Sequence, residues 1–507
     1  MQNGYAPAAG EPNAMPARHE RKIIFLLCIL AAIHVFIFSA AFPFFNNVDE
    51  PVHFDLVLRY SNGAVPRGPG TILKDSVEYI ALYNSWSYNN NAPGELPDGP
   101  PPPLWTEPPQ KEHSDFQADC APLQFVQDYE VSQTPLYYSV AGAWWDAGKG
   151  LGIHAGRRLY WLRFFNVIEI IALVWLAYLA ARMIFPEKPF IRLGTPALLA
   201  FMPQTAFYSI GNDMLPAICF GLAFICLLQW PENLSLKLGL ALGLAFAATW
   251  LSKETTLPQL IVVAAFVLLA SWKSARQGKA TALLVPITVF SVCAALPIVS
   301  WMLWSKAHYG DFTGSQLKMD HFGWTVKPFS DWWHHPLFTP AGCWTYFSGQ
   351  LSTVWQGEFY WHNQPLALPG SRAVYTILSL ALICAALPSL LPRSLTASAP
   401  QRRALLISLL CFVTGLGFFA LMSIAYDFHD CPYPSRQYPY FTSGRLLLGA
   451  LIPFLLLIVY GLDRLLARLG DKAKFAMLAA MICAMLVVEI TTDWPVFSNP
   501  YNWFHLP

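Results

Sequence analysis

Two adjacent carboxylates follow the first apolar segment of the chain, in the run from Asn47 to Phe54 (NVDEPVHF). A proline suits the first turn of a helix, and the residue before it is pushed toward an extended backbone. Asp49 and Glu50 are therefore expected at a helix N-terminus, where the helix dipole favours ionised carboxylates. Either could act as the general base for a hydroxyl group. His53 could orient a carboxylate or contact a phosphate. The alternative is an acidic cap that only starts a surface helix.

A third carboxylate lies in the short sequence Gly211-Asn212-Asp213, between two apolar runs. An ionisable group at membrane depth costs about 2.5–3.5 kcal/mol unless it faces a polar cavity. Asp213 is therefore a candidate site residue. The competing interpretation is a capped turn, because Asn and Asp also favour turns and helix starts.

Two basic residues also lie at the ends of apolar runs, Lys253 in the sequence SKET and Arg445 in the sequence SGR. Lys253 could pair with an acid or a phosphate. Arg445 could bind two oxygens of a phosphate, because a guanidinium matches that geometry. The alternative for both is a basic side chain that extends to the membrane surface.

The elements that position these residues must be membrane helices. Hydrophobic residues make up 55% of the chain and charged residues 12%, whereas soluble domains carry about 25% charged residues. The net charge is +1, and no basic cluster alternates with aromatic residues. Nucleic acid is therefore not an expected partner, and the lipid bilayer is.

Hydropathy predicts an all-α polytopic protein with eleven transmembrane helices. The first is Ile23 to Phe42, and one of the later runs is 194–210. The apolar length of the first run favours an uncleaved span over a signal peptide. Residues 21–492 would form the membrane domain, between a disordered cytoplasmic tail at 1–20 and an outer tail at 493–507.

Basic residues set the orientation. With the N-terminus in the cytoplasm, every inner loop is basic, as the positive-inside rule requires. Large outer loops are then expected at 43–162 and 305–371. The short apolar segment Leu136 to Gly150 contains two charged residues and is interpreted as a helix at the outer membrane face.

The cysteines suggest little chemistry. Only Cys120, Cys343 and Cys431 fall in predicted outer loops, where one disulfide in any of three pairings is conceivable. No cysteine or histidine has the spacing of a metal site.

This topology places the candidate residues on one side of the membrane. Asp49, Glu50, Asp213, Lys253 and Arg445 all project outward. Acids and phosphate-binding bases beneath aromatic-rich loops indicate a site for a lipid phosphate and a sugar-like partner.

These motifs resemble those of the GT-C superfamily of lipid-linked glycosyltransferases. The chain is most similar to the bacterial membrane family catalogued as domain of unknown function 2142. The resemblance is carried by DEPxHF from Asp49, by QTPLYY from Gln133, by Asn212-Asp213, by Lys253 and by Gly444-Arg445.

The resemblance implies a polyprenyl-phosphate sugar donor and a glycan, lipid or protein acceptor, with Asp49 or Glu50 as the base. His53, Asp213, Lys253, Arg445 and Tyr137 would bind substrate. The chain departs from the pattern at Thr134, where a Pro-Pro pair is common, and at Leu446, where Tyr often follows Gly-Arg. No cofactor is implied; a divalent metal occurs in the wider superfamily, but nothing in this sequence requires one.

The expected function is transfer of a sugar, with inversion, at the outer (periplasmic) face of the inner membrane. Two alternatives remain. An O-antigen ligase or polymerase would depend on His334, His335 or Arg436 of the late loops. A transporter or flippase of lipid-linked glycans would require ionisable residues deep within spans.

Overall fold

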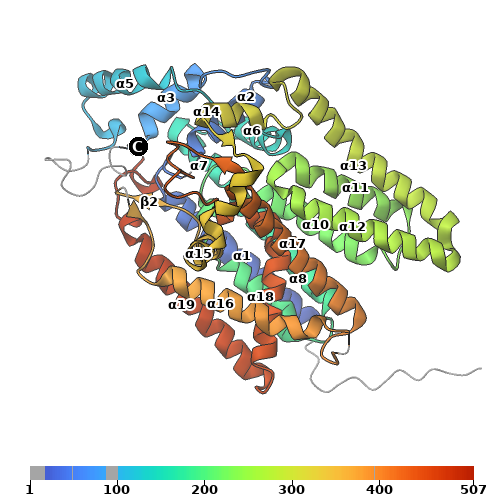
Figure 1. Cartoon of the computed structure of the whole chain (residues 1–507). Coiled ribbons are helices and arrows are strands. Elements are labelled where there is room, and N and C mark those ends of the chain that lie inside the picture. Colours follow the sequence, from blue (N-terminus) through green and yellow to red (C-terminus); the bar gives the residue numbers. More distant parts are fainter. Residues whose placement is uncertain (1–16, 48, 87–100, 363, 393, 507) are drawn as a thin grey trace, which may run out of the picture.

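The protein is almost entirely helical (Figure 1). The computed structural model describes residues 17–47, 49–86, 101–362, 364–392 and 394–506. Of the tail expected at 1–20, residues 1–16 lie outside this part. Residues 17–20 already form the first turn of helix α1.

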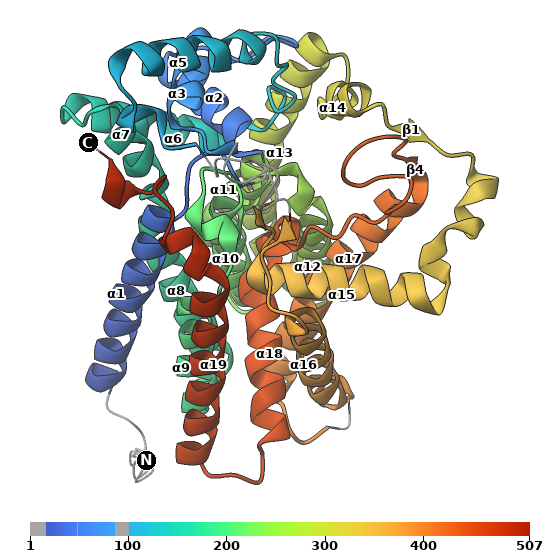
Figure 2. The same ribbon diagram turned by 90° about the vertical axis from the view of Figure 1, so that its left-hand side faces the viewer.

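A bundle of apolar helices forms the body of the molecule (Figures 1 and 2). Its members are α1 (Ala17–Ala41), α8 (Phe165–Ile184), α9 (Pro189–Ala200), α10 (Met214–Gln229), α11 (Leu236–Ser252), α12 (Leu257–Ser274), α13 (Ala280–Tyr309), α16 (Ser371–Ala386), α17 (Ala399–Ala425), α18 (Leu451–Leu465) and α19 (Asp471–Phe497).

Seven helical segments of the described chain are long and apolar enough to cross a membrane. One of them, Glu254–Tyr309, contains both α12 and α13. Helices α10 and α11 are apolar but shorter. A polytopic membrane protein is therefore supported, whereas the predicted number of eleven spans is not confirmed.

The apolar run 194–210 is not one helix, contrary to the sequence prediction. Helix α9 ends at Ala200, and only the short 3-10 helix η2 (Thr205–Tyr208) follows. Pro203 lies just beyond the end of α9, and a proline disfavours helical geometry in the residue before it. The irregular segment reaches the site through Gly211 to Asp213.

Small residues let two bundle helices approach closely. Helix α11 packs along α13, and a Cβ atom at Gly239 of α11 would lie 2.4 Å from the carbonyl oxygen of Pro286. Such close backbone contact is typical of helix pairs in membranes. It fixes the helix that ends immediately before Lys253.

Helix α18 is the central helix, and nearly all of its side chains are buried. The 3-10 helix η8 (Gly444–Ala450) leads into it. Arg445 is therefore attached to the most enclosed helix of the bundle.

Shorter helices gather at one end of the bundle, and the N-terminal end of α1 lies at the other (Figure 2). They come mainly from the two large loops. They are α2 (Glu50–Ser61), α3 (Lys74–Tyr83), α5 (Pro109–Leu123), α6 (Pro135–Gly150), α7 (Ala155–Arg163), α14 (Ser315–Phe322) and α15 (Pro340–Gln356).

In the described part of the chain, four two-residue strands form two antiparallel pairs. Strand β1 (Thr325–Val326) pairs antiparallel with β4 (Tyr426–Asp427), and β2 (Tyr360–Trp361) pairs with β3 (Gln364–Pro365). The first pair links the second large loop to the segment that precedes Arg445.

The segment expected at the membrane surface, Leu136 to Gly150, forms most of α6. It packs against α2, and it is not among the helices long and apolar enough to span. All ten cysteines are free thiols, so Cys120, Cys343 and Cys431 form no disulfide.

Candidate active site

Asp49 lies at the start of α2 in an unusual backbone conformation. Its φ of 63° is left-handed, a region that Asp tolerates better than most residues. Its Oδ2 is 2.6 Å from Nη2 of Arg445, and its Oδ1 accepts a hydrogen bond of 2.7 Å from the hydroxyl of Tyr129. Both carboxylate oxygens are thus held in a fixed direction.

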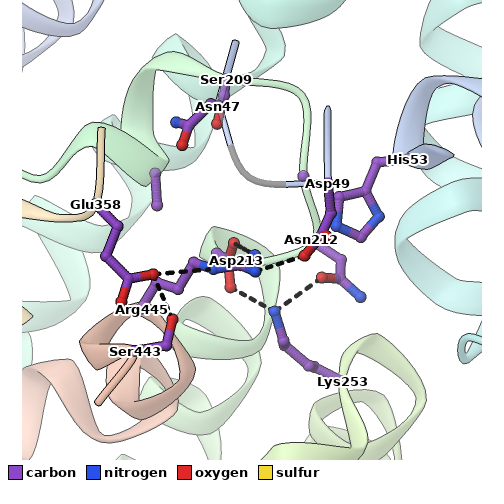
Figure 3. A network of polar contacts seen from close by, with 12 residues as sticks. Asn47, Asp49, His53, Ser209, Asn212, Asp213, Lys253, Glu358, Ser443 and Arg445 are labelled. Atoms are coloured by element: carbon purple, nitrogen blue, oxygen red, sulfur yellow. Dashed lines mark hydrogen bonds and ion pairs between the residues drawn. The ribbon is translucent and has the colours of Figure 1, made fainter. Parts of the chain in front are cut away.

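Arg445 is the centre of the site (Figure 3). Besides Asp49, its Nη1 lies 3.3 Å from Oδ2 of Asp213, and its Nε lies 3.8 Å from Oε2 of Glu358. The three acids come from segments more than a hundred residues apart. The guanidinium of Arg445 therefore connects the N-terminal ends of α2 and α10 with the C-terminal end of α15.

Lys253 extends the cluster on the far side of Asp213. Its ammonium donates to Oδ1 of Asp213 and, at 3.0 Å, to Oδ1 of Asn212. Both charged side chains are about 95% buried. Burial of such a pair is costly unless geometry and hydrogen bonds are favourable, so the pair holds the segment before α10 against the end of α11.

The neighbouring cations determine the protonation of Asp49 and Asp213. Burial alone would raise the pKa of Asp49, but the charges of Arg445 and Lys318 and the Tyr129 hydrogen bond hold that pKa well below its ordinary range. In the same way, Lys253 and Arg445 outweigh burial and lower the pKa of Asp213. Both carboxylates are therefore ionised at neutral pH.

His53 and Tyr137 lie beside the cluster and support it. Nδ1 of His53 is 2.7 Å from the hydroxyl of Tyr138, and burial lowers the pKa of His53 to about 4. The ring is therefore neutral at physiological pH. The hydroxyl of Tyr137 accepts a hydrogen bond of 3.2 Å from the backbone N–H of Gly211, so Tyr137 holds the segment that carries Asp213.

Glu50, the neighbour of Asp49, points elsewhere. Its two oxygens form a bidentate pair with Arg163, each at 2.8 Å. They also accept hydrogen bonds from the backbone N–H groups of Phe45 and Ile210. The side chain is fully buried. Glu50 is therefore bonded into the core beneath the site, an arrangement that leaves Asp49 as the carboxylate of this pair that faces the cluster.

Four residues of the site were not predicted from sequence: Glu358, Tyr129, and the ion pair of Lys318 with Glu130. All four lie in the segments predicted as the two large loops, at positions that no quoted motif includes. Ser443, which donates a 2.6 Å hydrogen bond to Glu358, belongs to the predicted SGR sequence. Among the described residues, the SGR sequence is therefore the one predicted motif that contacts Glu358 through a residue other than Arg445.

The carboxylates surround a guanidinium rather than an open position. Among the described residues, no group of three or more His, Cys, Asp or Glu side chains has the arrangement of a metal site. The prediction that no cofactor is needed stays a prediction.

The comparison with protein families identifies a family that this chain matches. Residues 30–425, more than three quarters of the chain, match the family described as Predicted membrane protein (DUF2142). The chain belongs to this family. The DUF2142 match includes Asp49, His53, Tyr137, Asp213 and Lys253, and it ends twenty residues before Arg445. No curated protein matches the chain.

Proposed function

We propose that this DUF2142 protein is a GT-C-type membrane glycosyltransferase that moves a sugar from a polyprenyl-phosphate donor to an acceptor hydroxyl. The observation that carries the proposal is the convergence of Arg445 and Lys253 with Asp49 and Asp213 at one end of the bundle. Phosphate-binding cations and a fixed carboxylate, at the end of apolar helices, fit a substrate with a lipid tail and a charged head.

Arg445 and Lys253 are the donor-phosphate ligands in this mechanism. A guanidinium binds two phosphate oxygens in a plane, and the nearby ammonium adds a second positive charge. When the bond between the sugar and the phosphate breaks, negative charge grows on the phosphate. Fixed cations stabilise that charge at little reorganisation cost.

Asp49 is the proposed base. It takes the proton of the acceptor hydroxyl while the acceptor oxygen attacks the anomeric carbon from the face opposite the phosphate, which inverts the configuration. Since Arg445 binds Asp49 at 2.6 Å in the protein alone, the donor phosphate must share or take over that guanidinium. Donor binding thereby weakens the interaction that makes Asp49 a poor base.

We also propose that the site faces outward, with the N-terminus in the cytoplasm of the inner membrane. Helix α12 begins beside Lys253 and runs 18 residues, about 27 Å, to the basic turn that contains Arg276 and Lys279. Arg464 lies in the last turn of α18, and η8, which contains Arg445, precedes the other end of that helix. Basic residues thus lie at the end of the bundle away from the cluster, as expected for cytoplasmic loops.

Reporter fusions test this orientation. A reporter after Lys279 should be cytoplasmic, and one after Pro507 external. An external signal after Lys279 would invert the protein and remove the outward-facing site.

Transfer itself is tested with the full-length protein in nanodiscs, a panel of radiolabelled polyprenyl-phosphate sugars and envelope extracts as the acceptor source. One donor should lose its sugar to the extract. Lys253→Met should reduce the rate by about tenfold or more, since hydrogen bonds to charged groups contribute about 1.5–3 kcal/mol. The matched control is Lys149→Met, which changes an exposed lysine of α6. No transfer from any donor, or equal rates for the two variants, would contradict the proposal.

The ligase alternative has less support. Both ring nitrogens of His335 serve loop structure, through the carbonyl of Pro439 and the backbone N–H of Leu337. Arg436 pairs with Asp427 at 3.1 Å. These residues stabilise the late loops, and His334 is exposed on them.

One observation favours the transporter alternative. His34 of α1 and Glu489 of α19 form a buried pair at 2.9 Å, and the hydroxyl of Tyr208 donates to the same carboxylate at 2.5 Å. Ionisable residues inside spans often mark transport or proton paths. Accumulation of a lipid-linked glycan in the opposite leaflet of proteoliposomes, without transfer, would identify a flippase.

A further inference from the structure

Glu358 is an ionisable side chain of the cluster that the proposed mechanism has not used. It follows Gly357, whose φ of 72° is left-handed and whose missing Cβ would lie 2.1 Å from Oγ1 of Thr205. The backbone N–H of Glu358 donates to that same oxygen at 3.1 Å. Only glycine fits here, and the resulting turn directs Glu358 toward Arg445 (Figure 3).

The surroundings of Glu358 are partly polar and mostly enclosed. Ser443 donates to Oε2 at 2.6 Å, and Nε of Arg445 lies 3.8 Å from the same oxygen. The carboxylates of Asp49 and Asp213 and the hydroxyls of Tyr360 and Tyr433 also interact with it electrostatically. The side chain is 13% exposed.

Arg445 and Lys253 contact three carboxyl groups in this cluster, and the nearby Lys318 is paired with Glu130. Arg445 makes its short contact with Asp49, and Lys253 bonds Asp213. Glu358 is left with the longest ionic contact, 3.8 Å. Burial raises its pKa to about 7, although Arg445 and the Ser443 hydrogen bond act in the opposite direction. Of the three, Glu358 is the carboxyl group that can carry a proton at neutral pH.

We propose that Glu358 is a second catalytic residue, the general acid that protonates the departing phosphate. The inference rests on the proposed transferase function. The bond between the anomeric carbon and the phosphate oxygen breaks, and its electron pair stays on that oxygen. Glu358 gives its proton to the phosphate, while Asp49 receives the proton of the acceptor hydroxyl as the new glycosidic bond forms. A proton returning from Asp49 to Glu358 through water restores the site.

Two physical reasons support this role. An ionised carboxylate beside the phosphate held by Arg445 would repel it, whereas a neutral carboxyl donates a hydrogen bond to it. The departing phosphate monoester has a second pKa of about 6, close to that of Glu358. Proton transfer is efficient when the two groups are so matched.

Donor binding as a function of pH tests the inference. The probe is methyl farnesyl phosphate, a diester whose single charge stays constant from pH 6 to pH 8.5. If only neutral Glu358 accepts the phosphate, wild-type affinity falls about 30-fold over this range, with a midpoint near pH 7, because the competent fraction falls. Glu358→Gln stays neutral, so its affinity should not change with pH, while its transfer rate falls by about 100-fold or more.

A second variant covers the case in which Glu358→Gln does not fold. Ser443→Ala removes a hydrogen bond that favours the ionised carboxylate, so the midpoint should move to higher pH. Wild-type binding that does not vary with pH, or a midpoint that Ser443→Ala leaves in place, overturns the role of Glu358. Absence of diester binding at any pH overturns the proposed function as well.

Discussion

Two arginines of this protein bind carboxylates in different ways. Arg163 pairs with both oxygens of Glu50, donates to the carbonyls of Ser39, Phe42 and Pro43, and is almost completely buried. Arg445 faces three carboxyl groups, its Nε has no hydrogen-bond acceptor among the described residues, and its side chain is 13% exposed. The guanidinium of Arg163 is buried with its hydrogen bonds made, whereas the guanidinium of Arg445 is partly exposed and is shared by several carboxyl groups.

Arg163 and Arg445 both pair with carboxylates, but the first pair stabilises the fold and the second belongs to the proposed site. A buried ion pair with every group satisfied has no capacity for another ligand. A cluster with more acids than bases has shifted protonation and can exchange partners when a phosphate arrives. Asp49 therefore belongs to the Arg445 cluster, whereas the adjacent Glu50 belongs to the buried pair with Arg163. Mutation of Glu50 should affect stability, and mutation of Asp49 should affect transfer.

The largest effect is expected from Glu50→Ala. It leaves the charge of Arg163 buried without its partner, which costs about 3–5 kcal/mol. The yield of folded protein and the thermal unfolding temperature in detergent should fall strongly. Glu78→Ala, at an exposed position of α3, is the control. A double variant, Glu50→Leu with Arg163→Met, should recover part of the stability. If Glu50→Ala is as stable as the wild type, the pair of Glu50 with Arg163 does not have the structural role described here.

Asp49→Asn should leave folding intact and reduce transfer by about 100- to 10,000-fold, the usual contribution of a general base. Asparagine keeps the size and the Tyr129 hydrogen bond but cannot take a proton. Binding of polyprenyl phosphate, measured separately, should persist or tighten, because Arg445 loses a competing anion. Near-normal transfer would exclude Asp49 as the base.

Arg445→Lys should weaken donor binding by about tenfold to a hundredfold, since a point charge replaces a bidentate group. Calorimetry with polyprenyl phosphate measures the change. Arg436→Lys is the matched control on the outer loop, where the arginine pairs with Asp427. Unchanged affinity in Arg445→Lys would place the phosphate elsewhere.

The smallest effect is expected from His53→Gln. The ring becomes charged only as the pH falls toward its pKa of about 4, so it contributes no positive charge to phosphate binding between pH 6 and pH 8. Loss of one hydrogen bond should change transfer by less than about tenfold. The dependence of the transfer rate on pH should be the same for the variant and the wild type in this range. If the variant lacks a pH-dependent change that the wild type shows near pH 7, His53 titrates there.

Sequence alone predicted the membrane class and the residues that meet at the site better than it predicted local geometry. Asp49, Asp213, Lys253 and Arg445 lie next to apolar runs, so hydropathy and the basic loops together predicted that these residues share one side of the membrane. The separate environments of Asp49 and Glu50 could not be predicted, because Arg163 lies more than a hundred residues away. Glu358 was missed for a similar reason: its environment depends on the turn at Gly357 and on Ser443, which only tertiary structure brings together.

A cryo-EM structure of the full-length protein in nanodiscs with a polyprenyl phosphate would show directly whether Arg445 and Lys253 bind the donor phosphate. We expect density for the phosphate within hydrogen-bond distance of Arg445 and Lys253, with the contact between Arg445 and Asp49 lengthened from 2.6 Å. The same phosphate bound at His334, His335 or Arg436, with the cluster around Arg445 unchanged, would contradict this expectation.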